Sequence, residues 1–523
     1  MRVCLLSPPY GDGGESMRPI GLMAIHSYLE GEFGSAVEVE LVDFSDCEPT
    51  AYALIDEYAL SEYDIVGLCS YSTNFMLVRG WAEEIKRRNP RCLTVIGGPH
   101  ATALPQHVAQ HHSDVFDYVV RGEGERPMAA IVRAVLEGHA ERPTAPGICF
   151  LGPLGVVGGQ TTDPVRDLDT VPPPVTRVKS PYERETSYFD KRDNRLRRAV
   201  ALTTSRGCPF TCSFCSIRAS NSKWRSVSAE RLSAWIRRSI ELEPQPIEHV
   251  YFMDADFLIN RKRVIEIGEM MARDYPKMTW SFSGRVDDLA RLGEDAIAKL
   301  TTQGLRAIEM GLESGSQASL DRLNKDVTVK ENYDAVAMLK RFDLELVIDF
   351  INFLPDSTPE HLRESLDFVR NAGLSEFFPA DHLSTYLLLY PATPLRTFYG
   401  NLFNRTFSND VLPEPDDLFI HEGTRRIFKH FVRDFRPYRG RLMALVETVE
   451  RGALEHAQSD RELAQFLRIE LVSLKHVQFL VLEALCRQPE AQSLLEAVPW
   501  LAQFEEHARQ LEELCGRNQR AAA

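Results

Sequence analysis

The sequence has few cysteines, no long hydrophobic run and no excess of positive charge, and each absence excludes a class of protein. Only 10 of its 523 residues are cysteine, irregularly spaced, which argues against a disulfide framework and for a reducing compartment. No segment approaches the roughly 18 apolar residues of a membrane-spanning helix, so we expect no membrane partner and a cytoplasmic location. The 60 basic and 75 acidic residues give a net charge of −15, without a long lysine or arginine run. We therefore expect no nucleic-acid partner, because phosphate binding needs a concentrated positive surface.

A close group of cysteines follows the apolar run at residues 199–202. Cys208, Cys212 and Cys215 are spaced C-x3-C-x2-C. Thiolate is the soft ligand that iron–sulfur clusters take, and three thiolates from one loop bind three irons of a [4Fe–4S] cluster while the fourth iron stays open. The alternatives are a structural zinc site, a disulfide or coincidence. A zinc site would need a distant fourth ligand, because no other Cys or His stands close by in the sequence.

The first 160 residues alternate between candidate strands and helices. Continuous apolar strands separated by helices predict a parallel sheet covered on both faces, a Rossmann-like (flavodoxin-like) domain. Such a sheet binds ligands at the carboxyl ends of its strands. Strands are predicted at residues 2–7, 37–44, 64–70, 92–96 and 118–120, and helices at 21–30, 51–60, 75–88 and 128–137.

The segments that follow these strands are suited to a ligand. Glycine permits close approach of a ligand to the backbone, and hydroxyl side chains bond polar groups. Taken alone, these segments predict only an open α/β sheet with a ligand crevice. Their residues are Pro9, Tyr10, Ser70, Tyr71, Ser72, Thr73, Asn74, Gly97, Gly98, Pro99, His100, Gly122 and Glu123.

A second α/β region follows a proline-rich linker at residues 161–195. Residues 196–400 repeat the order strand then helix, with strands predicted at 199–202, 249–253, 279–283, 306–310, 344–352 and 384–390. Helix starts are predicted at the N-cap Ser228, the capping box of Thr328 and the first-turn Pro359. Six such units predict an open (β/α)6 partial TIM barrel with its chemistry at the carboxyl ends of the strands. Residues 401–523 show helical periodicity instead, which predicts a helical C-terminal domain that covers the barrel or forms a dimer contact.

The cysteine loop resembles that of the radical S-adenosylmethionine (SAM) enzymes, in which an aromatic residue, here Phe214, precedes the last cysteine. The resemblance implies that Cys208, Cys212 and Cys215 are catalytic and hold a [4Fe–4S] cluster whose open iron binds SAM. An external reductant of flavodoxin or ferredoxin type then drives cleavage of SAM to a 5′-deoxyadenosyl radical. Arg285 would pair with the SAM carboxylate. Asn352 stands where the family usually has glycine, which departs from the pattern at the adenine. The implied SAM-binding residues are Phe214, Asp254, Arg285, Glu313, Ser314, Ile351 and Asn352.

Before such a core, the first domain resembles the cobalamin-binding domain of one large subgroup of this family. The matching segments are Arg18-Pro19-Ile20-Gly21-Leu22, Gly97-Gly98-Pro99-His100-Ala101 and Arg121-Gly122-Glu123-Gly124-Glu125. The resemblance implies that the strand-end residues named above, from Pro9 to Glu123, bind cobalamin, with Asn74 or Tyr71 near the cobalt. No D-x-H-x-x-G segment supplies a histidine below the cobalt.

Several alternatives stay open for this first domain. It could have lost cobalamin, and the loop at residues 70–75 could simply cap the third helix. His100 could be a solvent-exposed turn residue. We interpret His26 as ordinary helix packing.

Three hypotheses for function follow. The first is a cobalamin-dependent radical SAM enzyme that methylates an unactivated carbon of a small-molecule, natural-product-type substrate through a 5′-deoxyadenosyl radical and methylcobalamin. The second is a radical SAM enzyme that does not methylate and catalyses cyclisation, ring contraction, dehydration or epimerisation. The third is a cofactor-binding sensor without turnover. The sequence identifies neither the substrate nor the oligomeric state.

Overall fold

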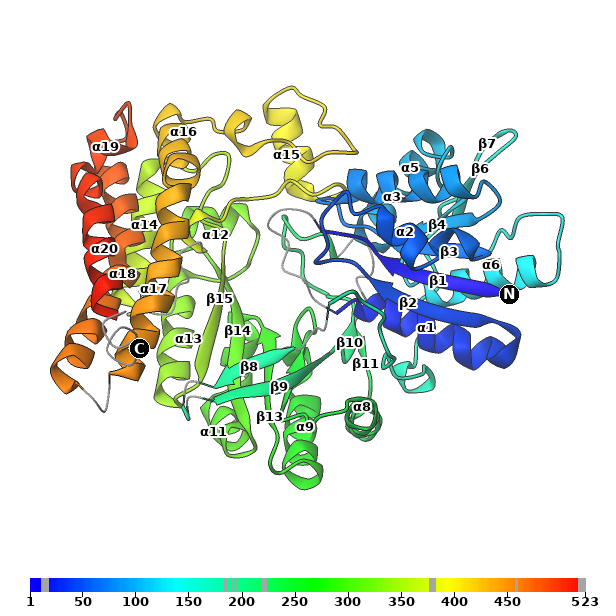
Figure 1. The fold of residues 1–523 in the computed structure, drawn as a ribbon, viewed down its shortest axis with the longest axis horizontal. Coiled ribbons are helices and arrows are strands. Elements are labelled where there is room, and N and C mark those ends of the chain that lie inside the picture. Colours follow the sequence, from blue (N-terminus) through cyan, green and yellow to red (C-terminus); the bar gives the residue numbers. More distant parts are fainter. Residues whose placement is uncertain are drawn as a thin grey trace. The chain divides into compact units, whose positions relative to one another are not determined.

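The apolar runs of the first 160 residues form a seven-stranded sheet in the computed structural model of the protein (Figure 1). The sheet order is β2-β1-β3-β4-β5-β6-β7, with five parallel strands followed by an antiparallel hairpin. This order confirms the flavodoxin-like prediction. The strands are β1 (Arg2–Ser7), β2 (Glu38–Asp43), β3 (Ile65–Cys69), β4 (Leu93–Gly97), β5 (Tyr118–Val120), β6 (Ile148–Gly152) and β7 (Gly155–Gly158).

The chain divides into two units. The first contains residues 1–284, 288–308 and 389–412, and the second contains residues 285–287, 309–388 and 413–523. The structure describes residues 1–10, 18–182, 186–190, 192–193, 195–217, 223–375, 382–456 and 460–515.

Helices cover both faces of the seven-stranded sheet. Strand β1 shows why, because Val3 and Leu5 enter one hydrophobic core while Cys4 and Leu6 enter the other. One core packs against α1 (Ile20–Phe33) and α6 (Glu125–Leu136), and the other against α2 (Ala53–Glu57), α3 (Phe75–Arg88) and α5 (Pro105–His111). The sequence predicted no helix between residues 97 and 117. The structure has α5 there, preceded by α4 (Gly98–Ala103), in which Pro99 occupies the first turn.

The first unit also contains the start of the barrel-type repeat. Its parallel strands β9 (Arg195–Leu202), β12 (His249–Phe252) and β13 (Thr279–Gly284) alternate with α8 (Ala229–Leu242) and α9 (Arg261–Asp274). The predicted N-cap is confirmed, since the Ser228 hydroxyl accepts a hydrogen bond from the Arg231 amide. The predicted linker holds an unforeseen strand, β8 (Ser187–Asp190), which pairs antiparallel with β9. Helix α15 (Pro394–Leu402) returns the chain to this unit.

Strand β14 (Leu305–Glu313) carries the repeat into the second unit. The capping box of Thr328 and the first-turn Pro359 are confirmed at the starts of α13 and α14. The following elements are α12 (Gln317–Arg322), α13 (Val329–Arg341), β15 (Glu345–Phe350) and α14 (Pro359–Asn371).

The predicted sixth strand at residues 384–390 is wrong. Only a single parallel bridge forms there, between Phe353 and Tyr386. The Phe353 amide donates to Thr385, and the Leu387 amide donates to the Phe353 carbonyl. The next donor of a parallel ladder would be the amide of residue 355, which is proline and has no N–H, so the ladder stops.

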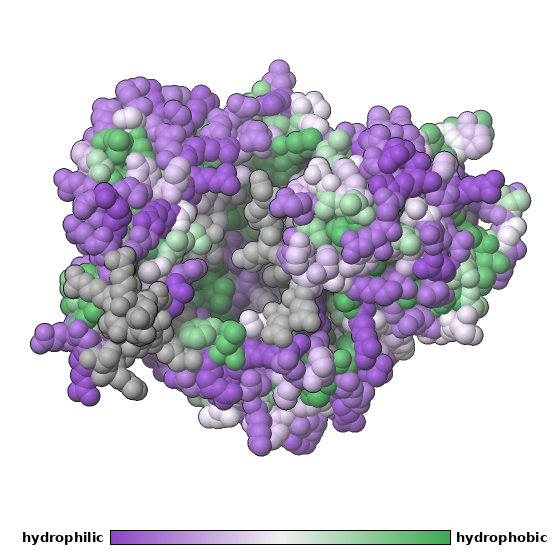
Figure 2. Space-filling view, in the orientation of Figure 1, coloured by the Kyte–Doolittle hydropathy of each residue, from purple (hydrophilic) through white to green (hydrophobic). Residues whose placement is uncertain are grey.

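Residues beyond 413 form the predicted helical region. Helix α18 buries one stripe that includes Leu467, Leu474, Val481 and Leu485, and the visible face of these helices is mainly hydrophilic (Figure 2). Among the described helices, none has the length and hydropathy needed to cross a bilayer. The helices are α16 (Glu422–Phe428), a π-helical turn (Lys429–Asp434), α17 (Arg436–Glu455), α18 (Arg461–Arg487), α19 (Leu494–Ala497) and α20 (Phe504–Cys515).

Candidate active site

The cysteine loop begins directly after a short strand, β10 (Ser205–Arg206), that pairs antiparallel with β11 (Arg225–Ser226). Gly207 turns the chain with φ +82°, a conformation that glycine adopts without strain. The Cys215 amide then donates to the Cys212 carbonyl at 3.3 Å. Cys208, Cys212 and Cys215 are half-buried and form no disulfide within the described residues. Three thiols in one short loop therefore fit the donor set of an iron–sulfur cluster.

Hydrogen bonds at two places hold the loop in position. The Leu395 amide, in the first turn of α15, donates to the Ser213 carbonyl at 3.0 Å. At the loop's base, the buried Asp254 carboxylate accepts from the Thr204 amide at 2.5 Å, the Thr204 hydroxyl at 2.6 Å and the Ser205 amide at 3.0 Å. Arg263 donates to the Thr204 carbonyl at 3.1 Å. Asp254, predicted to bind SAM, thus makes three contacts that position the loop.

Glu123, a predicted cobalamin-binding residue, connects the first domain to the cysteine loop. Its carboxylate pairs with Arg225 at 2.6 Å and with Arg206 at 3.2 Å, and Arg206 also pairs with Glu125 at 2.6 Å. Burial opposes ionisation of Glu123, but the two arginines outweigh it and lower the pKa of the carboxyl. Arg206 stands two residues before Cys208, so this network fixes the entry to the loop.

A cavity of about 370 Å³ opens at the carboxyl ends of the strands in the first domain. Its inner wall is apolar and includes Leu5, Ile25 and Met128, and its outer wall includes Thr203 and Arg206, which precede the cysteine loop. Seven of the predicted cobalamin-binding residues line it: Tyr10, Tyr71, Gly97, Gly98, Pro99, Gly122 and Glu123.

Glycine shapes this cavity. A Cβ atom on Gly98 would lie 2.6 Å from the Ser70 carbonyl oxygen, and one on Gly124 would lie 2.6 Å from the Ile25 side chain. Gly98 also has φ +91°, which favours glycine. Side chains at these positions would clash with these neighbours, so only glycine lets the backbone take this course beside the cavity.

The loop after β3 contains Asn74 and Tyr71, the two residues predicted to lie near the cobalt, and only Tyr71 lines the cavity. Asn74 is buried, with its amide oxygen accepting from the Tyr71 amide at 2.8 Å and its nitrogen donating to the Pro9 carbonyl at 3.2 Å. It therefore shapes the loop before α3. Tyr71 instead lines the cavity, with its ring 5.3 Å from that of Tyr10. Burial raises the pKa of the neighbouring Cys69 to about 12, so that this side chain stays a neutral thiol.

The other predicted cobalamin-binding residues do not line this cavity: Pro9, Ser70, Ser72, Thr73, Asn74 and His100. His100 is fully buried, stacks on Phe75 with 4.0 Å between ring centroids, and bonds Ser72 at 3.1 Å. The alternative of a solvent-exposed turn residue is therefore wrong, and burial lowers the pKa of His100 to about 4. His26 is packed as predicted, with its ring nitrogen bonded to the Val39 carbonyl.

The predicted SAM-binding residues fall into both units. Phe214, which is half-buried, and Asp254 belong to the first unit, and the other five belong to the second. In the second unit, a buried lysine that the sequence analysis missed brings two of the five together. Lys325 donates from Nζ to Glu313 at 2.6 Å, and its carbonyl accepts from Arg285 at 2.5 Å.

Glu313 adopts φ +60°, a conformation that costs a non-glycine residue energy and is typical of functional sites. Gly311 makes room for this ion pair, because a Cβ atom there would lie 2.6 Å from the Glu313 carboxylate.

The remaining three residues adjoin Glu313. The Ile351 amide donates to the Glu313 carbonyl at 2.7 Å, and the Ser314 hydroxyl bonds that of Ser365 at 3.1 Å. The Asn352 nitrogen donates to the Leu383 carbonyl at 2.9 Å. Its buried amide oxygen has no partner within the described part of the chain. That acceptor is free for a ligand, although asparagine replaces the expected glycine.

Comparison with known proteins gives the family. Residues 202–369 match the Radical SAM superfamily, and residues 12–132 match the B12 binding domain. The chain is a radical SAM protein with a B12-binding domain. Its cofactors are therefore a [4Fe–4S] cluster, SAM and cobalamin.

Two relatives and one solved structure are similar to this radical SAM protein. The anaerobic magnesium-protoporphyrin IX monomethyl ester cyclase of Rubrivivax gelatinosus is 29% identical over 381 residues, covering 71% of this chain and 66% of its own. The cobalamin-dependent radical SAM methyltransferase TokK of Streptomyces tokunonensis is 28% identical over 356 residues, covering 64% of this chain and 48% of its own. The chain thus spans less than two thirds of the length of either relative. The solved structure is the cobalamin-dependent SAM radical enzyme OxsB with aqua-cobalamin and SAM bound. It covers 99% of this chain and 83% of its own, with a TM-score of 0.64 at 16% identity, and so shares the fold.

The residues of this radical SAM protein fit the cofactors of its family. The glycine-rich, apolar lining of the cavity suits the apolar face of a corrin, and the three cysteine thiols, none in a disulfide, are cluster ligands by type. The sequence did not predict a role for Lys325. Its position shortly after the Gly311–Ser316 segment was the one feature that could have indicated it.

Proposed function

We propose that this protein is a cobalamin-dependent radical SAM enzyme that methylates an unactivated carbon of a small molecule. One observation carries the proposal. The cavity at the strand ends of the B12-binding domain has Thr203 and Arg206 in its wall, and the chain continues from Arg206 into Cys208. A corrin in this cavity would lie beside the loop that holds the cluster, as transfer of a methyl group to a short-lived substrate radical requires.

The chain's own residues would bind and orient the cluster and SAM. Cys208, Cys212 and Cys215 would hold the cluster, and Asp254 holds the base of their loop. When bound, the cluster and SAM supply a 5′-deoxyadenosyl radical, and cobalamin supplies the methyl group. Arg285 would pair with the SAM carboxylate and Glu313 with its amino or ribose groups, with Ser314, Ile351, Asn352 and Phe214 around the rest of the molecule.

The cobalamin site that we propose consists of the cavity-lining residues. Gly97, Gly98, Pro99 and Gly122 would let the corrin approach the backbone, and Tyr71 rather than Asn74 would face the cobalt, because only Tyr71 lines the cavity. The domains that we propose for this function are a cobalamin-binding domain (1–160), a linker (161–195), a partial barrel (196–400) and a helical domain (401–523). The reductant would be a flavodoxin or ferredoxin.

Product analysis tests the proposal. The protein is reconstituted under anaerobic conditions with iron, sulfide and cobalamin, and is then supplied with SAM, a reductant and candidate substrates. A methylated product is heavier by one CH2 unit, and each turnover yields one S-adenosylhomocysteine and one 5′-deoxyadenosine. Release of 5′-deoxyadenosine without S-adenosylhomocysteine would contradict methyl transfer.

A second candidate is a radical SAM enzyme that does not methylate. It is supported by the relative from Rubrivivax gelatinosus, which is named a cyclase and covers more of this chain than TokK does. Cyclisation, ring contraction, dehydration or epimerisation would leave the product without an added CH2 unit and would form no S-adenosylhomocysteine. A sensor without turnover would release no 5′-deoxyadenosine at all.

A further inference from the structure

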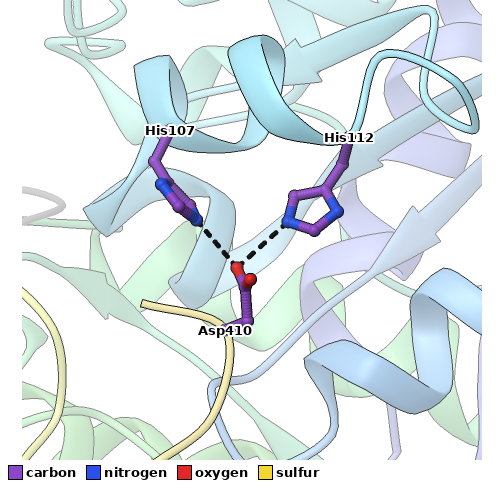
Figure 3. A group of neighbouring side chains, drawn as sticks. All are labelled: His107, His112 and Asp410. Carbon is purple, nitrogen blue, oxygen red and sulfur yellow. Dashed lines mark hydrogen bonds and ion pairs between the residues drawn. The ribbon is translucent and has the colours of Figure 1, made fainter. Parts of the chain in front are cut away.

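Two histidines and an aspartate of the first unit converge, and none of them lines the cavity (Figure 3). His107 belongs to α5, His112 follows directly after it, and Asp410 lies in the loop after α15. The Asp410 oxygen Oδ1 lies 2.7 Å from Nε2 of His107 and 3.0 Å from Nε2 of His112. Within the described part of the chain, none of the three residues lines the cavity or contacts the cysteine loop. The proposed function therefore gives these three side chains no role.

The chemistry of the three side chains matches one class of ligand. Their ligand atoms all lie within 4.8 Å of one another. Two imidazole nitrogens and one carboxylate oxygen are donors that zinc takes, with a fourth position left for water. His112 is buried, while His107 and Asp410 are half-buried, so the position is partly shielded yet accessible to an ion. We propose that His107, His112 and Asp410 bind a divalent transition metal, with Zn²⁺ as the best fit.

The neighbours of the imidazoles decide how tightly such an ion binds. The Asn409 nitrogen Nδ2 lies 3.4 Å from Nδ1 of His107 and donates to it. If the amide turns over, its oxygen accepts the Nδ1 proton instead, as outer partners of metal-bound histidines do. Arg79 opposes the ion, because its Nε donates to Nδ1 of His112 at 3.3 Å. In that arrangement the proton of neutral His112 is on Nε2 and points at Asp410. A metal at Nε2 requires this proton to move to Nδ1 and Arg79 to turn away.

Arg79 has other partners to retain when it turns. It pairs with Glu83 and with Asp114, both at 2.8 Å.

The ion would join segments about 300 residues apart in the chain, since it would hold the loop after α15 against α5. With three protein ligands, it would link these two segments and leave one coordination position to water. The first turn of α15 contains Leu395, whose amide donates to the Ser213 carbonyl in the cysteine loop.

Zinc binding to the full-length, cluster-reconstituted chain tests the proposal. Zn²⁺ is titrated calorimetrically, and bound zinc is measured by elemental analysis after dialysis. We expect one Zn²⁺ per chain that is lost in Asp410→Asn and in His107→Ala, with affinity lowered at least ~100-fold, because even the loss of an outer partner costs 10–100-fold. His111→Ala is the matched control. That histidine is exposed on the same helix, its Nδ1 is bonded to the His107 carbonyl at 3.0 Å, and its loss should leave zinc binding unchanged.

Arg79→Gln sharpens the test, because glutamine can accept the His112 Nδ1 proton that arginine repels. We expect zinc to bind more tightly to this variant than to the wild type. Iron content, measured in every variant, reports whether the chain is folded and the cluster present. Equal zinc content in the wild type, Asp410→Asn and His107→Ala would overturn the proposal, as would zinc binding that His111→Ala abolishes. Neither result would bear on the proposed methyl transfer, which product mass tests separately.

Discussion

The Asp254 carboxylate accepts hydrogen bonds from both the amide and the hydroxyl of Thr204, at 2.5 and 2.6 Å. Both residues are buried, and Arg263 completes the group by donating to the Thr204 carbonyl. Thr204 lies four residues before Cys208, so a carboxylate at the end of one barrel strand fixes the start of the loop that follows another.

Substitution of Asp254 by asparagine should therefore lower the iron content of the reconstituted protein, although Asp254 is not a cluster ligand. The amide offers one acceptor oxygen in place of two, which leaves a buried donor unpaired and costs about 1–3 kcal/mol. Iron and sulfide are measured after reconstitution, with the exposed Asp367→Asn on α14 as control. If Asp254 served SAM alone, the variant would keep its iron and only its SAM affinity would fall.

Filling the cavity should abolish cobalamin binding without unfolding the protein. Gly21 lines the cavity, and a Cβ atom there meets nothing within 4 Å. Gly21→Trp should lower cobalamin affinity at least about 10-fold, equivalent to about 1.4 kcal/mol, as measured by the absorbance of bound cobalamin. Gly440→Trp on α17 is the control, because a Cβ atom at that position also meets no atom within 4 Å. Normal cobalamin binding by Gly21→Trp would place the corrin elsewhere.

Loss of Lys325 should weaken SAM binding by releasing Glu313. The two side chains are both buried, and removing one partner of a buried ion pair costs about 3–5 kcal/mol. Lys325→Met should lower both stability and SAM affinity, measured by urea unfolding and equilibrium dialysis. Lys330→Met removes an exposed pair with Asp334 and should leave the free energy of unfolding nearly unchanged. SAM affinity equal to that of the wild type in Lys325→Met would exclude Glu313 from the site.

Buried histidines should make the protein less stable in mild acid. Burial lowers the pKa of His249 to about 3, and the ring bonds Thr279 at 2.8 Å and Ser281 at 2.7 Å. The unfolded chain takes up this proton near pH 6.5, so the contribution to stability is complete above pH 6.5 and is lost as pH falls toward 3. Each unit of pH in this window costs up to about 1.4 kcal/mol per histidine. Urea midpoints at pH 7 and pH 5 should differ less in His249→Gln, and His100 and His26, whose pKa values burial also lowers, contribute to the slope that remains. An unchanged difference would contradict a neutral His249.

Long apolar runs made much of the fold predictable from the sequence. Strand β1 and helix α3 have the predicted ends, because a buried strand needs a continuous apolar run and a helix a regular stripe. The sequence failed at α4, where Gly97-Gly98-Pro99 is typical of a turn. Only Gly98 takes a positive φ there, and Pro99 then starts a helix. The predicted sixth strand does not form, because Pro355 has no N–H to continue the ladder.

The candidate site was predictable only where neighbours in the sequence carry it. The cysteine spacing indicated the cluster loop, and the glycines indicated the cavity. Partners that meet only in the folded chain had no such signal. Lys325 and Glu313 lie on either side of α12 in the sequence, and Asp410 lies about 300 residues from His107 and His112. The second role of Asp254 was hidden for the same reason, since its contacts with Thr204 span 50 residues.

The release of 5′-deoxyadenosine by the Cys212→Ala variant tests the central claim most directly. The reconstituted wild type should form the [4Fe–4S] cluster and release 5′-deoxyadenosine from SAM under reduction, whereas Cys212→Ala should lose iron and fall to background. Cys486→Ala is the control, because burial raises the pKa of that thiol to about 12 and makes it an inert packing residue. Iron content and 5′-deoxyadenosine release in Cys212→Ala equal to those of the wild type would contradict the account.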